Sequence, residues 1–249
     1  MNKSTSWGKV ADWYNNLIEK GEDSYQKKLI LPNLIRLIKA GKGDVIVDLA
    51  CGQGFFAGEF AKSGARVIGI DVSSELIDIA KQNKSVEFHV SPAHKLNFLQ
   101  DGSTSKVLII LSLQNINNAQ DVIRETSRVL KPKGKLLIVL NHPAFRIPKA
   151  SSWGWDEARK VQYRRLDSYL SESSEEIQMR PGDKPWEKTI SFHRPLQFYF
   201  KTLNKNGFSV SKLEEWSSHK TSGTGPKKDA EDRARHEFPL FLFLEATKT

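Results

Sequence analysis

VIVDLACGQG, residues 45–54, is the stretch of this chain that decides its fold. Its first half is short, β-branched and almost continuously apolar, which is typical of a strand buried on both faces of a sheet. Its second half, CGQG (51–54), is a glycine turn, and Phe55 to Ser63 then has the composition of a helix. A buried strand that passes through a tight turn into a helix predicts the first unit of an α/β fold.

The alternation of strand and helix continues downstream of this unit. Further apolar runs predict four more strands, at 66–71, 86–90, 106–111 and 135–140. Helical spacing at 119–130 is followed by KPKG, which predicts a turn before the fifth strand. Such alternation requires right-handed crossovers, and it therefore predicts a parallel sheet.

The segments on either side of this core have other patterns. Residues 9–20 have the spacing of an amphipathic helix, and a second helix is predicted over 24–38 with a restart at Pro32. After Asn141 the alternation stops, and EEIQM (175–179) and KTISFH (188–193) predict two strands joined by a turn at 180–187.

The C-terminal part predicts a helix after Pro195 and two final strands, at 210–216 and 238–246. Residues 219–237, between these strands, predict a long solvated loop. No linker divides the chain, so we expect a single domain in four parts. These are N-terminal helices (1–43), a core (44–141), a cap or acceptor insertion (142–194) and a C-terminal helix with the final strands (195–249).

Composition limits the class of protein. The chain has 249 residues, 39% of them hydrophobic, so a sizeable core is possible. Its one cysteine excludes a disulfide framework and a multi-cysteine metal site, and we predict no metal centre. No apolar run approaches the ~18 residues of a membrane span, and the first residues lack a signal-peptide pattern. We expect a cytoplasmic protein without a membrane partner.

The net charge of +9 is the feature that points toward nucleic acid. The excess of basic residues is spread along the chain with a mild N-terminal bias, whereas proteins that track phosphates concentrate their charge. We favour a basic surface without a nucleic-acid partner, and keep such a partner as an alternative.

Glycines and acidic residues meet at the ends of the first two predicted strands. Gly52 and Gly54 allow a ligand to approach the backbone, and the following helix offers free N–H groups. Asp71 ends the second strand, where an acid suits the two hydroxyls of a ribose. Gly52-x-Gly54-x-x-Ala57 alone would also fit a dinucleotide site.

Asp48 distinguishes between the two kinds of ligand. A carboxylate four residues before the first glycine would repel a pyrophosphate, and it favours a ligand with a cationic amino-acid end. S-adenosylmethionine carries an ammonium and a sulfonium and has no phosphate. The sequence therefore predicts this cofactor.

The pattern Asp-x-x-x-Gly-x-Gly, followed by an acid after the second strand, resembles motif I and its sequel in the class I methyltransferases. The resemblance covers roughly 44–141. WGKVADWY (7–14), SFHRPLQFYFKTLNKNGF (191–208) and PLFLFLEATK (239–248) resemble the small-molecule, type-11 branch. The resemblance implies an enzyme with a Rossmann-like α/β fold. The sheet would have seven mostly parallel strands in the order 3-2-1-4-5-7-6, with an antiparallel C-terminal hairpin.

The resemblance also implies roles at the cofactor. Asp48, Gly52 and Gly54 would hold the methionine end and the ribose. Asp71 would bind the ribose hydroxyls, and Val72 would lie against the adenine.

Other predicted cofactor contacts lie on further segments. Many relatives have an acid after the third strand that binds the adenine amino group, but this chain has Ser91-Pro92 there. Ala93, through its N–H, or His94, through its side chain, is the expected substitute. Leu111 and Ser112 would lie beside the methionine portion, and Tyr14 would close over the cofactor.

The acceptor is expected at the same edge of the sheet, beside 113–117 and 141–148 and under a cap formed by 142–194. His142 and His193 are the candidate catalytic bases, for an acceptor that must lose a proton. The predicted reaction is methyl transfer to an oxygen or nitrogen of a small molecule, with S-adenosylhomocysteine as product. Two alternatives remain: an RNA or protein methyltransferase, and an NAD-type oxidoreductase or non-catalytic nucleotide-binding protein. The sequence predicts no oligomeric state.

Overall fold

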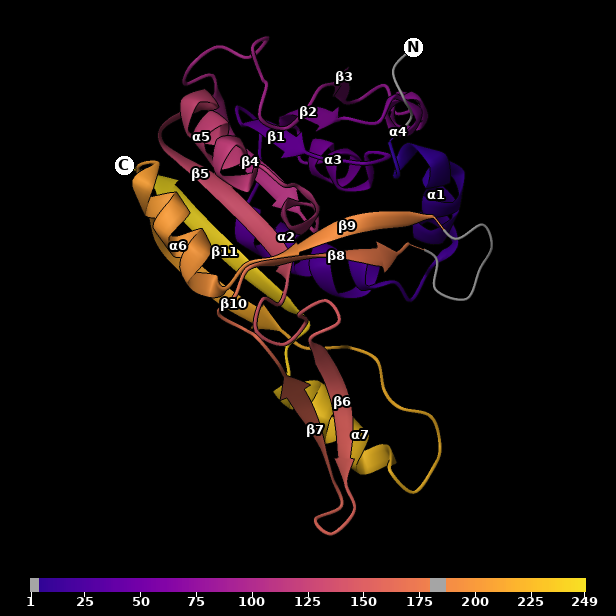
Figure 1. Cartoon of the computed structure of the whole chain (residues 1–249). Helices are drawn as coiled ribbons and strands as arrows, with labels where there is room; N and C mark the ends of the chain where they lie inside the picture. The colour runs from indigo at the N-terminus through magenta and orange to yellow at the C-terminus, as the bar shows by residue number, and fades with distance from the viewer. Residues whose placement is uncertain (1–4, 180–186) are drawn as a thin grey trace.

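A seven-stranded sheet forms the centre of the molecule in the computed structural model, which describes residues 5–179 and 187–249 (Figure 1). Its order is β3-β2-β1-β4-β5-β11-β10. The first five strands in this order are parallel, and β11 is antiparallel to both of its neighbours. The strands are β1 (Val45–Leu49), β2 (Arg66–Asp71), β3 (Glu87–Val90), β4 (Thr104–Ile110), β5 (Leu130–Asn141), β10 (Phe208–Trp216) and β11 (Phe241–Lys248).

The predicted fold class and strand order are confirmed, because β10 and β11 are the sixth and seventh strands of this sheet. The helices and helical turns are η1 (Gly8–Val10), α1 (Ala11–Lys20), η2 (Gln26–Ile30), α2 (Leu31–Ile38), α3 (Phe55–Ala61), α4 (Ser74–Ala80), η3 (Leu113–Asn115), α5 (Ala119–Val129), α6 (Leu196–Lys205) and α7 (Lys228–Glu237). Pro32 lies in the first turn of α2, at the predicted restart. Ser73 caps α4 through the Leu76 amide, as one of the two predicted serines.

Apolar side chains cover both faces of the sheet. Ile46 packs with α2, α3 and α4, whereas its neighbour Val47 packs with α5 and α6 on the opposite face. Successive residues of a strand point to opposite faces. A strand between two layers of helices must therefore be apolar throughout, which explains the unbroken run VIV in β1.

Three local predictions differ from the structure. KPKG (131–134) is a bulge inside β5, where five residues from Leu130 to Gly134 lie opposite Thr104 and Ser105 of β4. The expected loop 219–237 contains α7, because Ala230 and Ala234 are spaced to bury one face of a helix against the strand β7. A hairpin of β6 (Ser151–Asp156) and β7 (Val161–Leu166) was not predicted, because its exposed and half-buried side chains alternate too weakly.

The insertion after β5 forms two separate hairpins rather than one cap. β6–β7 projects away from the sheet with α7, as the lower lobe in Figure 1. β8 (Ser173–Gln178) and β9 (Lys188–His193) form the second hairpin, which runs toward α1. There the Ser6 hydroxyl donates to Thr189 Oγ1 over 3.4 Å, and Lys9 lies 3.5 Å from Glu187. The two strands match the prediction; most of the predicted turn, 180–186, lies outside the described residues.

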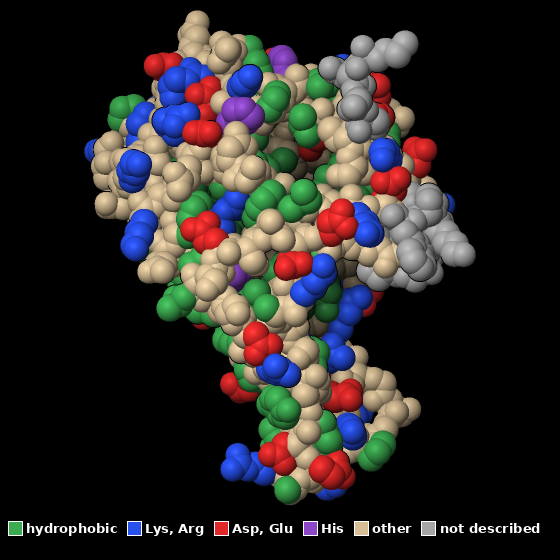
Figure 2. All heavy atoms as spheres, in the orientation of Figure 1, with side chains coloured by type: hydrophobic (Ala, Val, Ile, Leu, Met, Phe, Trp, Pro, Cys, Tyr) green, Lys and Arg blue, Asp and Glu red, His purple; other side chains and the backbone are tan. Residues whose placement is uncertain are grey.

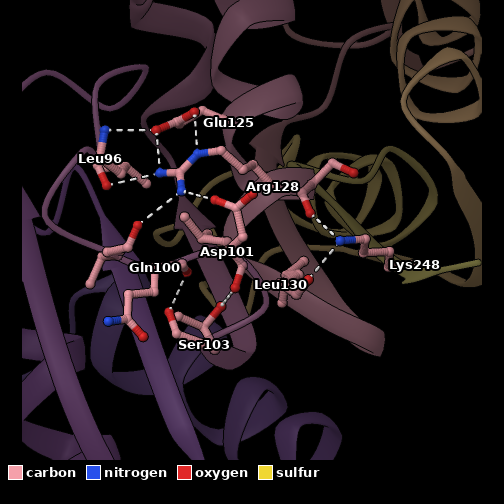
Figure 3. A network of polar contacts seen from close by, with 12 residues as sticks. Leu96, Gln100, Asp101, Ser103, Glu125, Arg128, Leu130 and Lys248 are labelled. Atoms are coloured by element: carbon pink, nitrogen blue, oxygen red, sulfur yellow. Dashed lines mark hydrogen bonds and ion pairs between the residues drawn. The ribbon is translucent and has the colours of Figure 1, made fainter.

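Arg128 of α5 holds the segment that leads from β3 to β4 (Figure 3). Its guanidinium donates to the carbonyls of Leu96 and Leu99, each over 2.9 Å. The same guanidinium is paired with Glu125, which also accepts the Leu96 amide over 2.9 Å. These contacts satisfy both backbone groups of Leu96, so they fix this segment against α5.

Candidate active site

A cavity of about 340 Å³ opens at the carboxyl ends of β1, β2 and β4. Figure 2 shows the upper part of the molecule hollowed, with hydrophobic side chains around the hollow. Every predicted cofactor residue except Gly54 lines this cavity: Tyr14, Asp48, Gly52, Asp71, Val72, Ala93, His94, Leu111 and Ser112. The lining contains no lysine or arginine among the residues that the structure describes.

Asp48 is a buried carboxyl group with an unsatisfied oxygen. Only 2% of the residue is exposed, and Oδ2 has no hydrogen-bond partner among the described residues. Burial, together with the charge of Asp71, raises the pKa of Asp48 to about 8. Because a buried polar atom without a partner is costly, this oxygen is suited to a ligand that brings a donor or a positive charge.

Asp71 is held by the backbone around it. Its Oδ2 accepts the Gly52 amide and its Oδ1 accepts the Ser73 amide, each over 2.9 Å. Burial raises the pKa of this carboxyl, while these amides act against the shift. Each carboxylate oxygen can accept a second hydrogen bond, so Asp71 can still accept from two hydroxyls of a ligand.

The two glycines of the turn have different roles. Gly52 has φ +58°, and a Cβ there would lie 3.3 Å from Cε1 of Tyr14. Gly54 has φ +84° and precedes α3, but a Cβ at this position would clash with Phe88 at 2.7 Å. Gly54 therefore lets α3 pack closely against β3, and its predicted contact with the cofactor does not match its position outside the cavity lining.

Non-glycine residues with positive φ follow two of the strands at the cavity. Ala50 after β1 has φ +55°, and Leu111 after β4 has φ +53°. Such conformations cost roughly 1–3 kcal/mol and are concentrated at functional sites. Ser112, next to Leu111, has a buried hydroxyl without a partner among the described residues. This strand end therefore presents a second unsatisfied polar atom at the cavity.

Tyr14 of α1 lies over the glycine turn, and Trp7 packs edge-to-face against it with ring centroids 5.4 Å apart. Burial, followed by the charges of Asp71 and Asp48, raises the pKa of Tyr14 to about 12. The phenol is therefore neutral at physiological pH. Both aromatic rings line the cavity, so η1 and α1 form one of its walls.

Neither predicted catalytic histidine lines this cavity. His142 Nε2 lies 2.7 Å from Glu215, and burial lowers the pKa of His142. His193 is 4% exposed and its Nε2 donates to the Tyr169 carbonyl over 2.7 Å. The expectation that His193 faces the cofactor assumed that one cap covers the site. The insertion instead divides into two hairpins, and β9 packs against η3 with His193 outside the cavity lining.

Several cavity residues were not identified from the sequence. Asn118 is one of them, whereas its neighbours Asn115 to Asn117 belong to the predicted acceptor segment 113–117 and also line the cavity. The other predicted acceptor segment, 141–148, does not reach the cavity. Gln26, Phe55 and Phe56 also line the cavity. Phe55 and Phe56 follow the glycine turn directly at the start of α3. Their position could therefore have indicated from the sequence that they line the cavity. Gln26 had no such signal, because η2 lies far from the turn in sequence.

Comparisons with known proteins agree with this geometry. Residues 47–138 match a family model described as a methyltransferase domain. Over this range the chain is similar to methyltransferase domains. The crystal structure of an S-adenosylmethionine dependent methyltransferase from Mesorhizobium loti has a TM-score of 0.69 to this chain at 24% identity. The likeness covers 87% of this chain and 96% of that one. S-adenosylmethionine is the cofactor of this class.

Curated relatives that match about half of this chain include two kinds of methyltransferase. A demethylmenaquinone methyltransferase of Renibacterium salmoninarum is 28% identical over 136 residues, which cover 54% of this chain and 55% of that protein. A ubiquinone biosynthesis O-methyltransferase of Xanthomonas oryzae pv. oryzae is 30% identical over 126 residues, with coverages of 47% and 53%. The chain thus spans about half the length of the curated relatives it matches.

Neither a membrane-spanning helix nor a cluster of metal ligands is present in the residues that the structure describes. In the described part of the chain, no helix combines the length and the apolar character that crossing a bilayer requires. No group of three or more potential metal ligands was found in the same residues.

Proposed function

We propose that this protein transfers a methyl group from S-adenosylmethionine to a small-molecule acceptor. The observation that carries the proposal is the unsatisfied, buried Asp48 oxygen in a cavity whose described lining has no basic side chain. A dinucleotide would bring a pyrophosphate to this acidic site, whereas S-adenosylmethionine brings an ammonium and a sulfonium. Charge complementarity therefore supports the methyl donor.

The residues present fit this cofactor. Asp48 would accept from the ammonium, Asp71 would accept from the ribose hydroxyls, and Gly52 would allow the ligand to approach the turn. Val72, Ala93 and His94 also line the cavity, and they would contact the adenine. When bound, S-adenosylmethionine supplies a methyl group on an activated leaving group. The protein's part is then to align the reactants and to exclude water.

The acceptor we propose is small and carries no phosphate. Asn115, Ile116 and Asn117 line the cavity beside Ser112, and they would offer amide groups and one apolar side chain to it. The names of the curated relatives, which specify demethylmenaquinone and ubiquinone biosynthesis, support an acceptor of small-molecule size. His142 and His193 are not part of this proposal, because they lie outside the cavity lining.

Calorimetry of the full chain tests the cofactor and the two alternatives together. S-adenosylhomocysteine should bind, and NADH at the same concentration should give no heat of binding. A tRNA probe should bind with neither high affinity nor the steep salt dependence of a phosphate-tracking protein. Binding of NADH in place of S-adenosylhomocysteine would contradict the proposal, and strong, salt-sensitive tRNA binding would favour the RNA methyltransferase.

Binding of S-adenosylhomocysteine should release a proton and should strengthen with pH. The Asp48 carboxyl, with its pKa raised to about 8, is protonated at neutral pH, and a ligand ammonium favours its ionised form. We expect the affinity to rise by up to about tenfold per pH unit from about pH 6 to about pH 8 and then to level off. Titrations in buffers of different ionisation enthalpy measure the proton released.

Asp48→Asn is the matched variant, and it should bind without this pH dependence. Adenosine, which lacks the ammonium, is the control ligand and should bind equally at all these pH values.

The free energy of unfolding of the ligand-free protein should fall as the pH rises, whereas the affinity for the ligand rises. The unfolded chain loses the proton near pH 3.8, but the folded protein keeps it to about pH 8, so the free energy of unfolding falls across this range. An affinity that is independent of pH in the natural protein would contradict the role of Asp48.

A further inference from the structure

Arg194, at the end of β9, makes its contacts with the acceptor-side wall of the cavity. Its Nη2 donates to the carbonyls of Ile116 and Asn117 over 2.9 and 2.7 Å, and its Nη1 approaches the Leu113 carbonyl at 3.4 Å. Arg194 is only 5% exposed. A side chain from the inserted segment is thus bound to the backbone that follows β4.

Aromatic rings hold the guanidinium in place. Its central carbon lies 5.1 Å from the ring centre of Phe192 and 5.2 Å from that of Phe198. No carboxylate forms an ion pair with Arg194 among the described residues. A planar group with donors fixed in a fork, held between rings, is well suited to bind several carbonyls at once. Lysine cannot reproduce this arrangement.

The wall depends on these hydrogen bonds. Among the described residues, no other donor reaches the carbonyls of Ile116 and Asn117. Both hydrogen bonds are partly buried, so loss of Arg194 would remove the protein donors of these carbonyls and leave this segment less firmly held. Asn115 to Asn118 line the cavity, and only Leu113 and Gln114 separate them from Leu111 and Ser112, the residues expected at the methionine end of the cofactor.

Arg128 is the counterpart on the segment that follows β3, where it forms the polar network of Figure 3. It binds the carbonyls of Leu96 and Leu99, and the segment that it holds begins with Ser91 to His94, the wall expected to face the adenine. Each end of the cavity is thus fixed by an arginine bound to backbone carbonyls. The two arginines come from different elements, β9 and α5, so each end can be perturbed separately.

We propose that Arg194 is a positioning residue that sets the wall at the methionine end of the cavity. This inference rests on the proposed function, because it assigns the methionine end to Leu111 and Ser112. Arg194 acts through the backbone of 113–117 and does not itself line the cavity. The inserted segment would therefore influence methyl transfer through the shape of this wall rather than through a base.

The test compares two ligands in two variants. In Arg194→Lys, the dissociation constant of S-adenosylhomocysteine should rise about tenfold, while that of adenosine, which lacks the methionine portion, should change less than about twofold. In the control Arg128→Lys, both ligands should weaken by the same factor. Hydrogen exchange of the ligand-free Arg194 variant should increase within 112–118 and not across the sheet.

Phe198→Leu is the second variant, in case Arg194→Lys does not fold. It keeps the guanidinium but removes one of the rings that hold it, so it should give the same pattern with a smaller effect. Equal weakening of both ligands, or no weakening, in the folded Arg194 or Phe198 variant would overturn the inference. If the natural protein does not bind S-adenosylhomocysteine, the proposed function fails instead. The exchange of 112–118 then still tests whether Arg194 holds the wall.

Discussion

Gly52→Val is expected to abolish measurable binding of S-adenosylhomocysteine while the sheet remains folded. Gly52 has φ +58°, which valine adopts only with strain, and its Cβ position is already 3.3 Å from the Tyr14 ring. The rest of the branched side chain would fill the part of the cavity where the ligand approaches the turn. We expect a loss of more than about a hundredfold in affinity, or more than about 2.7 kcal/mol, by calorimetry.

Gly43→Val is the control that separates the effect of backbone strain on the protein from the effect of a side chain that fills the cavity. Gly43 has φ +93°, but no atom lies within 4 Å of its Cβ position, and it is not part of the cavity lining. This control should lower the melting temperature through the same kind of strain and keep the natural affinity. Unchanged binding in a folded Gly52→Val variant would remove the glycine turn from the site.

Asp71→Ala should weaken S-adenosylhomocysteine binding by ~2–4 kcal/mol, because a buried carboxylate that accepts charge-assisted hydrogen bonds from the ligand is lost. Part of the loss comes from the protein itself. The amides of Gly52 and Ser73 lose their partner, so the turn is no longer held in the binding conformation. Adenosine should weaken by a similar factor, because it carries the same ribose hydroxyls.

Asp229→Ala is the control for removal of a carboxylate. Asp229 is exposed in the first turn of α7, in the lobe that projects away from the cavity. This variant should bind S-adenosylhomocysteine with the natural affinity. If Asp71→Ala binds with the same affinity as Asp229→Ala, then Asp71 neither contacts the ligand nor holds the turn in the conformation that binds it.

The sequence by itself determined the core of the fold and most of the cavity. VIVDLACGQG predicted a doubly buried strand, a turn and a helix because these features depend on local patterns: continuous apolar residues, glycine and helix spacing. Asp48 and Asp71 could be assigned to one edge because parallel strands bring their carboxyl ends together. Residue type also indicated the ligand, since the carboxylate of Asp48 suits a cationic group and would repel a phosphate.

Only the tertiary structure decided the parts of the site that depend on distant segments. Gly54 looked like Gly52 in sequence, but Phe88 of β3 packs where its side chain would be. His193 and Arg194 are neighbours near a helix start, and the sequence favoured the histidine for its chemistry. The path of β9 instead brings Arg194 to the carbonyls of Ile116 and Asn117. The packing of the hairpins decides which side chain contacts a backbone group about 80 positions away in the sequence, and no local sequence pattern predicts that contact.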